Sequence, residues 1–429
     1  MNKTKYLVLG NSVAGIACAE GIREADPDGH ILIAAKEPHH TYSRPLITYL
    51  LGGKVDEANM DYRPPEFYDK MDVETALGTE ITQINPADHT VDTADGEQIG
   101  YEKLLIAIGG EPIVPPNIEG SDADGVFTFT TLDDAYEIEE YIEDNDVEAA
   151  VIVGGGLIGL KSVEALMELG LRTTVVELMD RMLSATFDRT ASDMAQRKLE
   201  SEGADVCCET TVSRIITEDG KVAGAELTDG STIDCGLVIF AIGVAPSVHV
   251  VEGTDIEVDR GILVDDRMQT TAEDVYAAGD IAQACELLSG DRQCIAIFPN
   301  AYRQGKIAGL NMAGADRSYD GALVMNSVSV CDLPTISVGR TEAGGEGVEE
   351  LIDCDEDSLH YRKIVLEHGK IIGAVFVGDI ERAGIFTGLI REQIDVTKFK
   401  DLLLSDEFGI IHLPDDYRTN VMSGVETEA

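Results

Sequence analysis

Two glycine-rich turns carry the residue types and spacings in this sequence that are best suited to chemistry. The first reads Gly10-Asn11-Ser12-Val13-Ala14-Gly15 and the second reads Gly154-Gly155-Gly156-Leu157-Ile158-Gly159, and each lies between an apolar run and a helical pattern. Glycine permits a tight turn and a close approach of the backbone, so the free amide groups at the start of the helix can bind a pyrophosphate. Each turn is therefore predicted to bind a dinucleotide.

An acid at the end of the following strand would accept hydrogen bonds from the ribose hydroxyls. After the second turn this acid is Glu177, whose charge disfavours a 2′-phosphate and so favours NADH over NADPH, with Arg181 as the only nearby cation. After the first turn Lys36 stands where an acid is expected and Glu37 comes next, so the position is ambiguous, and we choose Glu37. Ser12 replaces the usual middle glycine, and its small hydroxyl can still lie beside a pyrophosphate.

The two turns belong to a unit that occurs twice in the chain. Each copy has a strand, a glycine turn, a helix, a second strand ending near an acid, a β-meander and a closing strand. Repetition of this length predicts an α/β fold with two Rossmann-like domains. The strands are predicted at Tyr6–Leu9, Ile31–Ala35 and Lys103–Ile108 in the first copy and at Val151–Val153, Thr173–Val176 and Leu237–Ile242 in the second, with meanders from near Ala76 and Asp205.

The composition limits the class of protein. With 429 residues, 44% of them hydrophobic, the chain should form two or three packed domains. The 80 acidic residues outnumber the 32 basic ones, and the net charge of −48 argues against a nucleic-acid partner. This surplus fits a protein adapted to a high-salt cytoplasm and a merely acidic protein equally well.

No targeting or metal-binding segment is predicted. The apolar runs are strand-length and fall short of the ~20 residues of a membrane span, and the chain starts directly with a strand pattern, so we expect a cytoplasmic enzyme without a signal peptide. The eight cysteines form no CxxC pair and show no zinc or iron–sulfur spacing, so no metal site is expected. Scattered cysteines such as Cys18, on the first helix, are typical of core packing in a reducing compartment.

A third motif, Thr271-Ala272-Glu273-Asp274-Val275-Tyr276-Ala277-Ala278-Gly279-Asp280, follows the second unit. Together these motifs make the whole chain resemble the FAD-dependent pyridine nucleotide–disulfide oxidoreductase family. Two further runs are most similar to NADH:rubredoxin and NADH:ferredoxin reductases and to the flavin portion of NAD(P)H-dependent nitrite reductase: His40-Thr41-Tyr42-Ser43-Arg44-Pro45-Leu46-Ile47 and Val377-Gly378-Asp379-Ile380-Glu381-Arg382-Ala383-Gly384. The resemblance implies glutathione-reductase-like FAD and NAD domains and a C-terminal α+β interface domain.

The resemblance also implies which residues contact the cofactors. Asp280, next to Gly279, would bind a ribityl hydroxyl of FAD. Arg44 would contact the FAD phosphate or ribityl groups, and Ile81 would offer backbone contacts to the adenine. Further cofactor contacts are expected after the closing strands, at Ala107, Gly109 and Gly243. Others are expected at the start of a later helix, at Pro299 and Asn300, where the helix dipole would favour charge at the flavin pyrimidine edge.

The absence of certain cysteines bears on the electron acceptor. Disulfide-reducing relatives carry one or two cysteines on the helix that faces the flavin, and the matching segment here, Tyr42–Leu51, has none. Without a thiolate there is no relay from the flavin to a disulfide. We therefore expect hydride transfer from NADH to FAD and onward transfer of electrons to an iron–sulfur or rubredoxin-type carrier.

Two residues depart from the family pattern beside the flavin. Relatives commonly pair a glutamate after the second glycine turn with a lysine of the Arg-Pro segment, and the corresponding residues here are Lys161 and Tyr49. The cation has thus moved to the other element, although the macrodipole disfavours lysine in the first turn of a helix. Our hypothesis is that Lys161, with Tyr49, lies near the flavin and stabilises its reduced, anionic form.

These predictions give three domains. FAD is expected on residues 1–120 and 246–320, NADH on residues 121–245, and a C-terminal interface domain on residues 321–429, with strands at Lys363–Leu366 and Ile371–Val377, a helical end, and a disordered tail from about Val421. A homodimer or a redox complex is expected. Two alternatives stay open: direct reduction of a small acceptor such as oxygen, peroxide, polysulfide or a quinone, and a flavin-bearing subunit of a larger redox complex.

Overall fold

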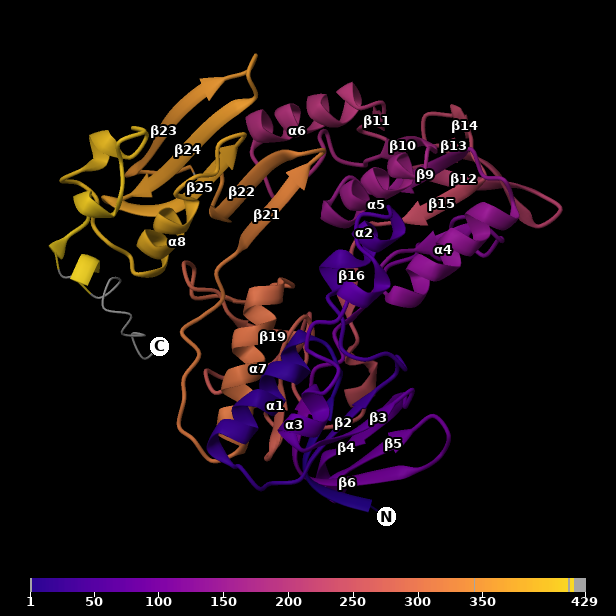
Figure 1. Cartoon of the computed structure of the whole chain (residues 1–429), viewed down its shortest axis with the longest axis vertical. Helices are drawn as coiled ribbons and strands as arrows, with labels where there is room; N and C mark the ends of the chain where they lie inside the picture. Colours follow the sequence, from indigo (N-terminus) through magenta and orange to yellow (C-terminus); the bar gives the residue numbers. More distant parts are fainter. Residues whose placement is uncertain (1, 343, 416, 420–429) are drawn as a thin grey trace.

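The computed structural model describes residues 2–342, 344–415 and 417–419, so the tail predicted from Val421 lies outside the described residues. Figure 1 shows the chain as three lobes, which follow one another in the colour sequence except that the orange segment around α7 lies against the indigo N-terminal lobe. Among the described residues, no helix is both long enough and apolar enough to cross a bilayer.

The first lobe is built on a seven-stranded sheet in the order β3-β2-β1-β6-β5-β4, with β18 added beside β6. The strands β1, β2, β3, β6 and β18 are parallel, whereas β4, β5 and β6 form an antiparallel meander. Because β18 comes from residues after the second unit, the chain returns to complete the first sheet. The bounds are β1 Asn2–Leu9, β2 Ile31–Ala35, β3 Val73–Leu77, β4 Ile81–Asn85, β5 Thr90–Thr93, β6 Gln98–Ile106 and β18 Val275–Ala277.

Two helices of this lobe cross at very short range. A Cβ atom added to Gly305 or Gly309 of α7 (Phe298–Met312) would lie 2.1 Å from a backbone oxygen of α1 (Val13–Ala25). The small residues on both helices therefore allow the backbones to touch, which leaves no space for side chains between them. This contact attaches the returning segment to the helix that follows the first glycine turn.

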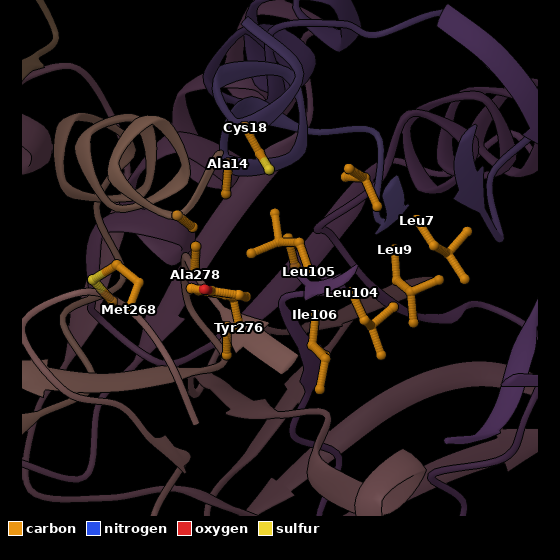
Figure 2. Close-up of a cluster of buried hydrophobic side chains, with 14 of the residues drawn as sticks. Leu7, Leu9, Ala14, Cys18, Leu104, Leu105, Ile106, Met268, Tyr276 and Ala278 are labelled. Atoms are coloured by element: carbon orange, nitrogen blue, oxygen red, sulfur yellow. The ribbon is translucent and has the colours of Figure 1, made fainter. Parts of the chain in front are cut away.

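The core of the first lobe joins residues that are far apart in the sequence. Figure 2 shows Leu7 from β1, Leu105 from β6, Cys18 from α1 and Tyr276 from β18 in one buried cluster. Cys18 is fully buried, as the sequence predicted, and burial raises the pKa of its thiol well above the ordinary range. The cluster holds the start of α1 against the sheet edge at which the first glycine turn lies.

The second lobe repeats the parallel arrangement in a five-stranded sheet of order β11-β10-β9-β15-β8, covered by α4, α5 and α6. An antiparallel sheet of β12, β13 and β14 lies beside it and corresponds to the predicted second meander. The bounds are β8 Val126–Thr128, β9 Ala149–Val153, β10 Arg172–Val176, β11 Asp205–Cys207, β12 Val212–Glu218, β13 Lys221–Leu227, β14 Thr232–Asp234, β15 Leu237–Phe240, α4 Leu132–Asp144, α5 Leu157–Glu168 and α6 Arg189–Ser201.

The two lobes are connected by a two-stranded antiparallel ribbon. The outgoing segment forms β7 (Gly110–Pro112) and the returning segment forms β16 (Val244–Pro246), and these strands pair with each other. Both covalent connections between the lobes therefore run side by side. The short elements of the first lobe are α2 Ile47–Leu51, α3 Phe67–Met71, β17 Ile262–Leu263, β19 Ala282–Cys285 and β20 Arg292–Gln293.

The third lobe is an antiparallel sheet of order β21-β22-β25-β24-β23, and one face of this sheet packs on α8 (Ala383–Arg391). The predicted C-terminal helical end consists of α8, two single 3-10 turns at Lys400–Leu402 and Ile410–His412, and helical backbone at the described residues 415 and 417–419. The sheet strands are β21 Met325–Val330, β22 Leu333–Gly339, β23 Val348–Asp355, β24 His360–Glu367 and β25 Lys370–Val377. The α/β class with an additional α+β lobe is as the sequence predicted.

Several predicted bounds need correction. The closing strands end at Ile106 and Phe240, two residues earlier than predicted, because the backbone then turns at the edge of each sheet where the glycine turn lies. The first of them also begins earlier, at Gln98, since its first half pairs within the meander. Ala76 and Asp205, where the meanders were expected to begin, lie in β3 and β11, which pair in parallel with β2 and β10.

A buried polar network joins the second and third lobes. Asp188 accepts hydrogen bonds from the Ala191 amide at 3.1 Å, which caps α6, and from the Tyr361 hydroxyl at 2.7 Å. Lys363 Nζ lies 3.1 Å from the same carboxylate and 2.9 Å from Glu350, and its side chain is 6% exposed. A buried carboxylate is thus fully paired across the interface.

Replacing Lys363 with Ala should weaken this interface strongly. The substitution leaves the buried carboxylate of Asp188 without its cation, and breaking such a pair from one side costs about 3 kcal/mol or more. We expect a lower thermal unfolding midpoint by calorimetry. The matched control is Lys400→Ala, which breaks an exposed ion pair with Glu349 in the same lobe and should leave the midpoint almost unchanged. Equal effects of the two variants would contradict this reading.

Candidate functional site

The first glycine turn places the helix directly on the strand that precedes it. A Cβ atom on Gly15 would lie 1.9 Å from the Gly10 carbonyl oxygen, and one on Gly10 would lie 2.2 Å from the Ala107 oxygen. Gly10 also has a φ of +112°, which other residues rarely adopt. Ser12 is the N-cap of α1, and its side chain makes no capping hydrogen bond. The hydroxyl and the first-turn amides, which include those of Val13 and Ala14, are therefore free to bind an anion.

The second glycine turn has the same geometry. A Cβ atom on Gly159 would lie 1.9 Å from the Gly154 oxygen, matching the first turn, and Gly154 has a φ of +114°. Each turn also starts with an amide that donates to the neighbouring strand at 2.8 Å, from Gly10 to Ala34 and from Gly154 to Val176. The duplication found in the sequence is thus a duplication of hydrogen bonds and close contacts.

The middle residue of the second turn is free of such contacts. A Cβ atom on Gly156 would meet no atom of the described chain within 4 Å, and its φ of −79° suits any residue. The open space beside Gly156 lies at the start of α5. A pyrophosphate placed there would contact the backbone of Gly156, Leu157 and Ile158. The residues present therefore fit a dinucleotide.

The acid of the second site is held rigidly. Glu177 accepts a hydrogen bond from the Gly155 amide at 2.6 Å through one carboxylate oxygen and from the Met179 amide at 2.7 Å through the other. Each oxygen keeps a second lone pair for a ribose hydroxyl. The nearby Arg181 is paired with Asp180 at 3.1 Å and with Glu342 of the third lobe at 3.0 Å.

The structure separates the two candidates for the acid of the first site. Lys36 is 72% exposed and pairs with Glu80 at 2.9 Å, so it points to solvent. Glu37 is turned inward, where its carboxylate accepts hydrogen bonds from the Tyr42 hydroxyl and from Arg44. Arg44 also donates to the Thr130 carbonyl at 2.8 Å. The geometry favours Glu37, and cofactor contact by either residue stays a prediction.

Three separate segments converge at the start of α1. Gly279 has a φ of +82°, and a Cβ atom there would lie 3.2 Å from Ala14 of α1 and 3.7 Å from Ala301 of α7. Burial raises the pKa of the adjacent Asp280 carboxyl, and the positive charge of Arg44 opposes that shift. The charges of Asp280 and Arg44 thus interact, which is compatible with the predicted contacts of both residues to one cofactor.

The start of α7 supplies an unpaired buried donor. Asn300 is 3% exposed, and its Nδ2 has no hydrogen-bond partner among the described residues. Because a buried donor without a partner costs free energy, this group fits a bound acceptor such as a flavin. Pro299 precedes it in the first helical turn, where the missing amide hydrogen has no cost.

The remaining predicted contacts lie at the edges of the two parallel sheets. Ala107 is 7% exposed, and its amide donates to Leu9 at 2.8 Å, which continues the sheet into the turn. Gly109 and Gly243 both have positive φ, and a Cβ atom on either would meet no described atom within 4 Å. Ile81, the first residue of β4, is 8% exposed. Their cofactor contacts stay predictions.

The structure brings Lys161 and Tyr49 together, as the sequence predicted. Lys161 Nζ lies 5.2 Å from the centroid of the Tyr49 ring, so the exchanged positions face each other across α5 and α2. The ammonium also donates hydrogen bonds of 2.6 Å to Glu164 and 2.6 Å to the Ser329 carbonyl. A catalytic role for either predicted residue is not tested by this contact.

Three residues of this site were missed by sequence reasoning. Glu164 could have been found, because it stands at i+3 from Lys161 on the same helix. Ser329 and Cys331 could not, since they belong to the third lobe. Cys331 places a sulfur near Lys161, but burial, followed by the charge of Glu164, raises the pKa of its thiol to about 11, so it carries no thiolate at neutral pH.

Comparisons with known protein families agree with this geometry. Residues 4–305 match the family model described as pyridine nucleotide-disulphide oxidoreductase. Residues 325–394, which include the five strands of the third lobe, match the model described as rubredoxin NAD+ reductase C-terminal domain.

Individual proteins are similar over almost the whole chain. The NADH-dependent phenylglyoxylate dehydrogenase subunit epsilon of Aromatoleum evansii is 32% identical over 95% of this chain and 96% of its own. An NAD-dependent persulfide reductase from A. fulgidus superposes with a TM-score of 0.85 at 27% identity, over 94% of this chain and 79% of that one. The NADH:rubredoxin oxidoreductase from Clostridium acetobutylicum superposes with a TM-score of 0.73 at 25% identity, over 93% and 97%.

The open space above Gly156 makes a sharp test of the second site. In Gly156→Ala the new methyl group meets only the space reserved for the pyrophosphate, so the Kd for NADH should rise about tenfold, or ~1.4 kcal/mol. Stability should fall by less than about 1 kcal/mol, the cost of a poorer N-cap. Binding is measured by titration calorimetry and stability by thermal unfolding.

The control for this experiment is Gly159→Ala, in which the methyl group collides with the Gly154 carbonyl oxygen. That variant should have a clearly lower thermal unfolding midpoint than Gly156→Ala, because a backbone oxygen must move to admit the methyl group. Unchanged NADH binding in Gly156→Ala would show that the dinucleotide does not use this turn.

Proposed function

This chain belongs to the pyridine nucleotide-disulphide oxidoreductase family, and we propose that it oxidises NADH and passes the electrons through FAD to an iron–sulfur or rubredoxin-type carrier protein. Members of this family are oxidoreductases that use FAD and NAD(P)H. We assign FAD to residues 1–120 and 246–320, NADH to residues 121–245, and an interface domain to residues 321–429.

The match of the third lobe to the rubredoxin NAD+ reductase C-terminal domain carries the choice of acceptor. The lack of cysteine in Tyr42–Leu51 supports it, because no sulfur is placed on α2 to pass electrons to a disulfide. Cys331 does not replace such a sulfur, since its thiol stays protonated at neutral pH.

The roles of the site residues follow from their positions. FAD, when bound, supplies the acceptance of a hydride and the release of electrons one or two at a time. The two glycine turns would hold the pyrophosphates of FAD and NADH, while Asp280 and Arg44 would orient the FAD chain. Asn300 donates a hydrogen bond from its unpaired amide group. Lys161 places a positive charge beside Tyr49 at the flavin.

A preference for NADH over NADPH is supported by the charges around the second site. Glu177 is fixed by two backbone amides, so its negative charge cannot swing away from a 2′-phosphate. Arg181, the cation that could bind such a phosphate, is engaged by Asp180 and Glu342. Repulsion without a compensating cation disfavours NADPH.

Two other functions have specific support. The similarity to an NAD-dependent persulfide reductase favours a small sulfur-containing acceptor. The relative in Aromatoleum evansii is named as a subunit, and this chain spans 96% of it, which favours a role as the NADH-reactive subunit of a larger redox complex. In that complex the electron carrier would be a partner subunit.

Anaerobic stopped-flow mixing with NADH separates these functions. We expect prompt bleaching of the flavin absorbance, and fast turnover only when ferredoxin or rubredoxin is added. NADPH should bleach the flavin much more slowly. Rapid turnover with polysulfide, persulfide or oxygen alone would favour the small-acceptor function, and no bleaching would contradict the proposed enzyme.

Replacing Lys161 with Ala should lower the midpoint potential of the bound flavin. A positive charge beside the flavin stabilises its anionic reduced form, and the loss of that charge makes reduction less favourable. The potential is measured by anaerobic reductive titration with a reference dye. Lys70→Ala, which removes an exposed lysine of the first lobe, is the control and should leave the potential unchanged. An unchanged potential in Lys161→Ala would remove the lysine from the flavin site.

A further inference from the structure

Lys161 is held by contacts that come from the third lobe as well as from its own helix. Its ammonium donates one hydrogen bond to Glu164 of α5 and another to the Ser329 carbonyl of β21, both at 2.6 Å. The side chains of Lys161 and Glu164 are only 15% and 12% exposed. This pair is therefore shielded from solvent, unlike an ordinary helix-surface ion pair.

Glu164 binds both the lysine and the tip of the β21–β22 hairpin. One carboxylate oxygen accepts from Lys161, and the other accepts from the Cys331 backbone amide at 2.8 Å. Lys161, Glu164, Cys331 and Ser329 thus form a closed ring of contacts between α5 and the hairpin. Removing Glu164 would take away two anchors at once: its own contact to Lys161, and the contact that holds the hairpin tip presenting Ser329.

The hairpin tip is shaped to make this contact. Cys331 and Asp332 have φ values of +45° and +68°, the arrangement of a tight two-residue hairpin turn, although neither is glycine. On either side, Val330 is fully buried and Leu333 is 9% exposed, and both pack into the core of the second lobe. The apolar flanks fix the tip against α5, which directs the Cys331 amide at Glu164.

A second ion pair, between Glu168 of α5 and Lys54 after α2, differs from the buried Lys161–Glu164 pair. Glu168, four residues after Glu164, pairs with Lys54 at 2.8 Å, and these side chains are 48% and 44% exposed. Both pairs line the same hollow between α2 and α5. Only the Lys161–Glu164 pair reaches the third lobe and the Tyr49 ring, so the two pairs provide a matched comparison.

We propose that Glu164 is a positioning residue, which together with the β21–β22 hairpin tip holds the Lys161 ammonium against Tyr49 at the flavin. The C-terminal lobe thereby controls the charge beside the flavin of its own chain. This proposal rests on the function proposed above, because it requires flavin at the meeting point of α2 and α5.

The alternative is that Glu164 acts only as a nearby negative charge or only as a structural contact. The sign of one measurement distinguishes these cases. If Glu164 holds Lys161 in place, Glu164→Ala releases the ammonium toward solvent and toward Glu168, and the midpoint potential of the flavin falls, as in Lys161→Ala. If Glu164 acts only through its own charge, removing that charge raises the potential. A purely structural contact leaves it unchanged.

The experiment compares Glu164→Ala with Glu168→Ala in the full-length holoenzyme. We expect a lower flavin potential in the first and an unchanged potential in the second. In the Lys161→Ala background, Glu164→Ala should cause no further fall. A rise in potential, no change, or an equal fall without Lys161 would each overturn the proposal.

A second measurement needs no flavin. Deuterium labelling of the backbone amides in the hairpin-tip peptide around Cys331, followed by mass spectrometry, should be several-fold faster in Glu164→Ala because the hairpin tip is released, and unchanged in Glu168→Ala. Glu164→Gln serves as a milder variant, with smaller changes of the same sign. Equal labelling in all variants would overturn the anchoring of the hairpin, whereas failure of NADH to bleach the flavin in the unmodified protein would instead contradict the proposed function.

Discussion

In both glycine turns, the helix after the turn lies so close to the strand before it that a single Cβ atom would collide with a carbonyl oxygen. This contact puts the helix axis directly over the strand end and leaves the first-turn amides facing the same way as the strand. Backbone geometry alone therefore fixes the position that an anion would take at each helix start. The rest of the fold brings side chains to the starts of α1 and α5.

The first site is completed by chain that returns after an insertion of more than a hundred residues. The return depends on small residues, because α7 can touch α1 only where glycines remove the side chains between them. Through this crossing, Gly279 comes close to Ala14 of α1 and to Ala301 of α7. Glycine thus has two separate functions here: it opens the backbone to a ligand, and it allows two distant helices to pack.

Much of this arrangement could be predicted from the sequence, because it is local. The glycine turns, the strands around them and Glu177 lie within short segments whose pattern is sufficient, and the facing of Lys161 and Tyr49 followed from the resemblance to a family. The contacts of Lys161 with Ser329 and Glu164 with Cys331 were not predictable, since they join residues about 170 positions apart and depend on how the third lobe docks. The closing strands were placed two residues too far because apolar residues continue into the turns.

The ribbon of β7 and β16 has a consequence for how the two nucleotide sites can move. The two chain connections between the lobes are hydrogen-bonded to each other along β7 and β16. Such a ribbon can bend about one axis, but it resists sliding and twisting because either would break the pairing of both strands. The third lobe contacts the second lobe through Asp188 and Lys363, and it contacts the first lobe through Leu287 and Leu288, which pack on its core. The two predicted nucleotide sites are thus linked twice, by the paired strands of the ribbon and by a third lobe that contacts both lobes.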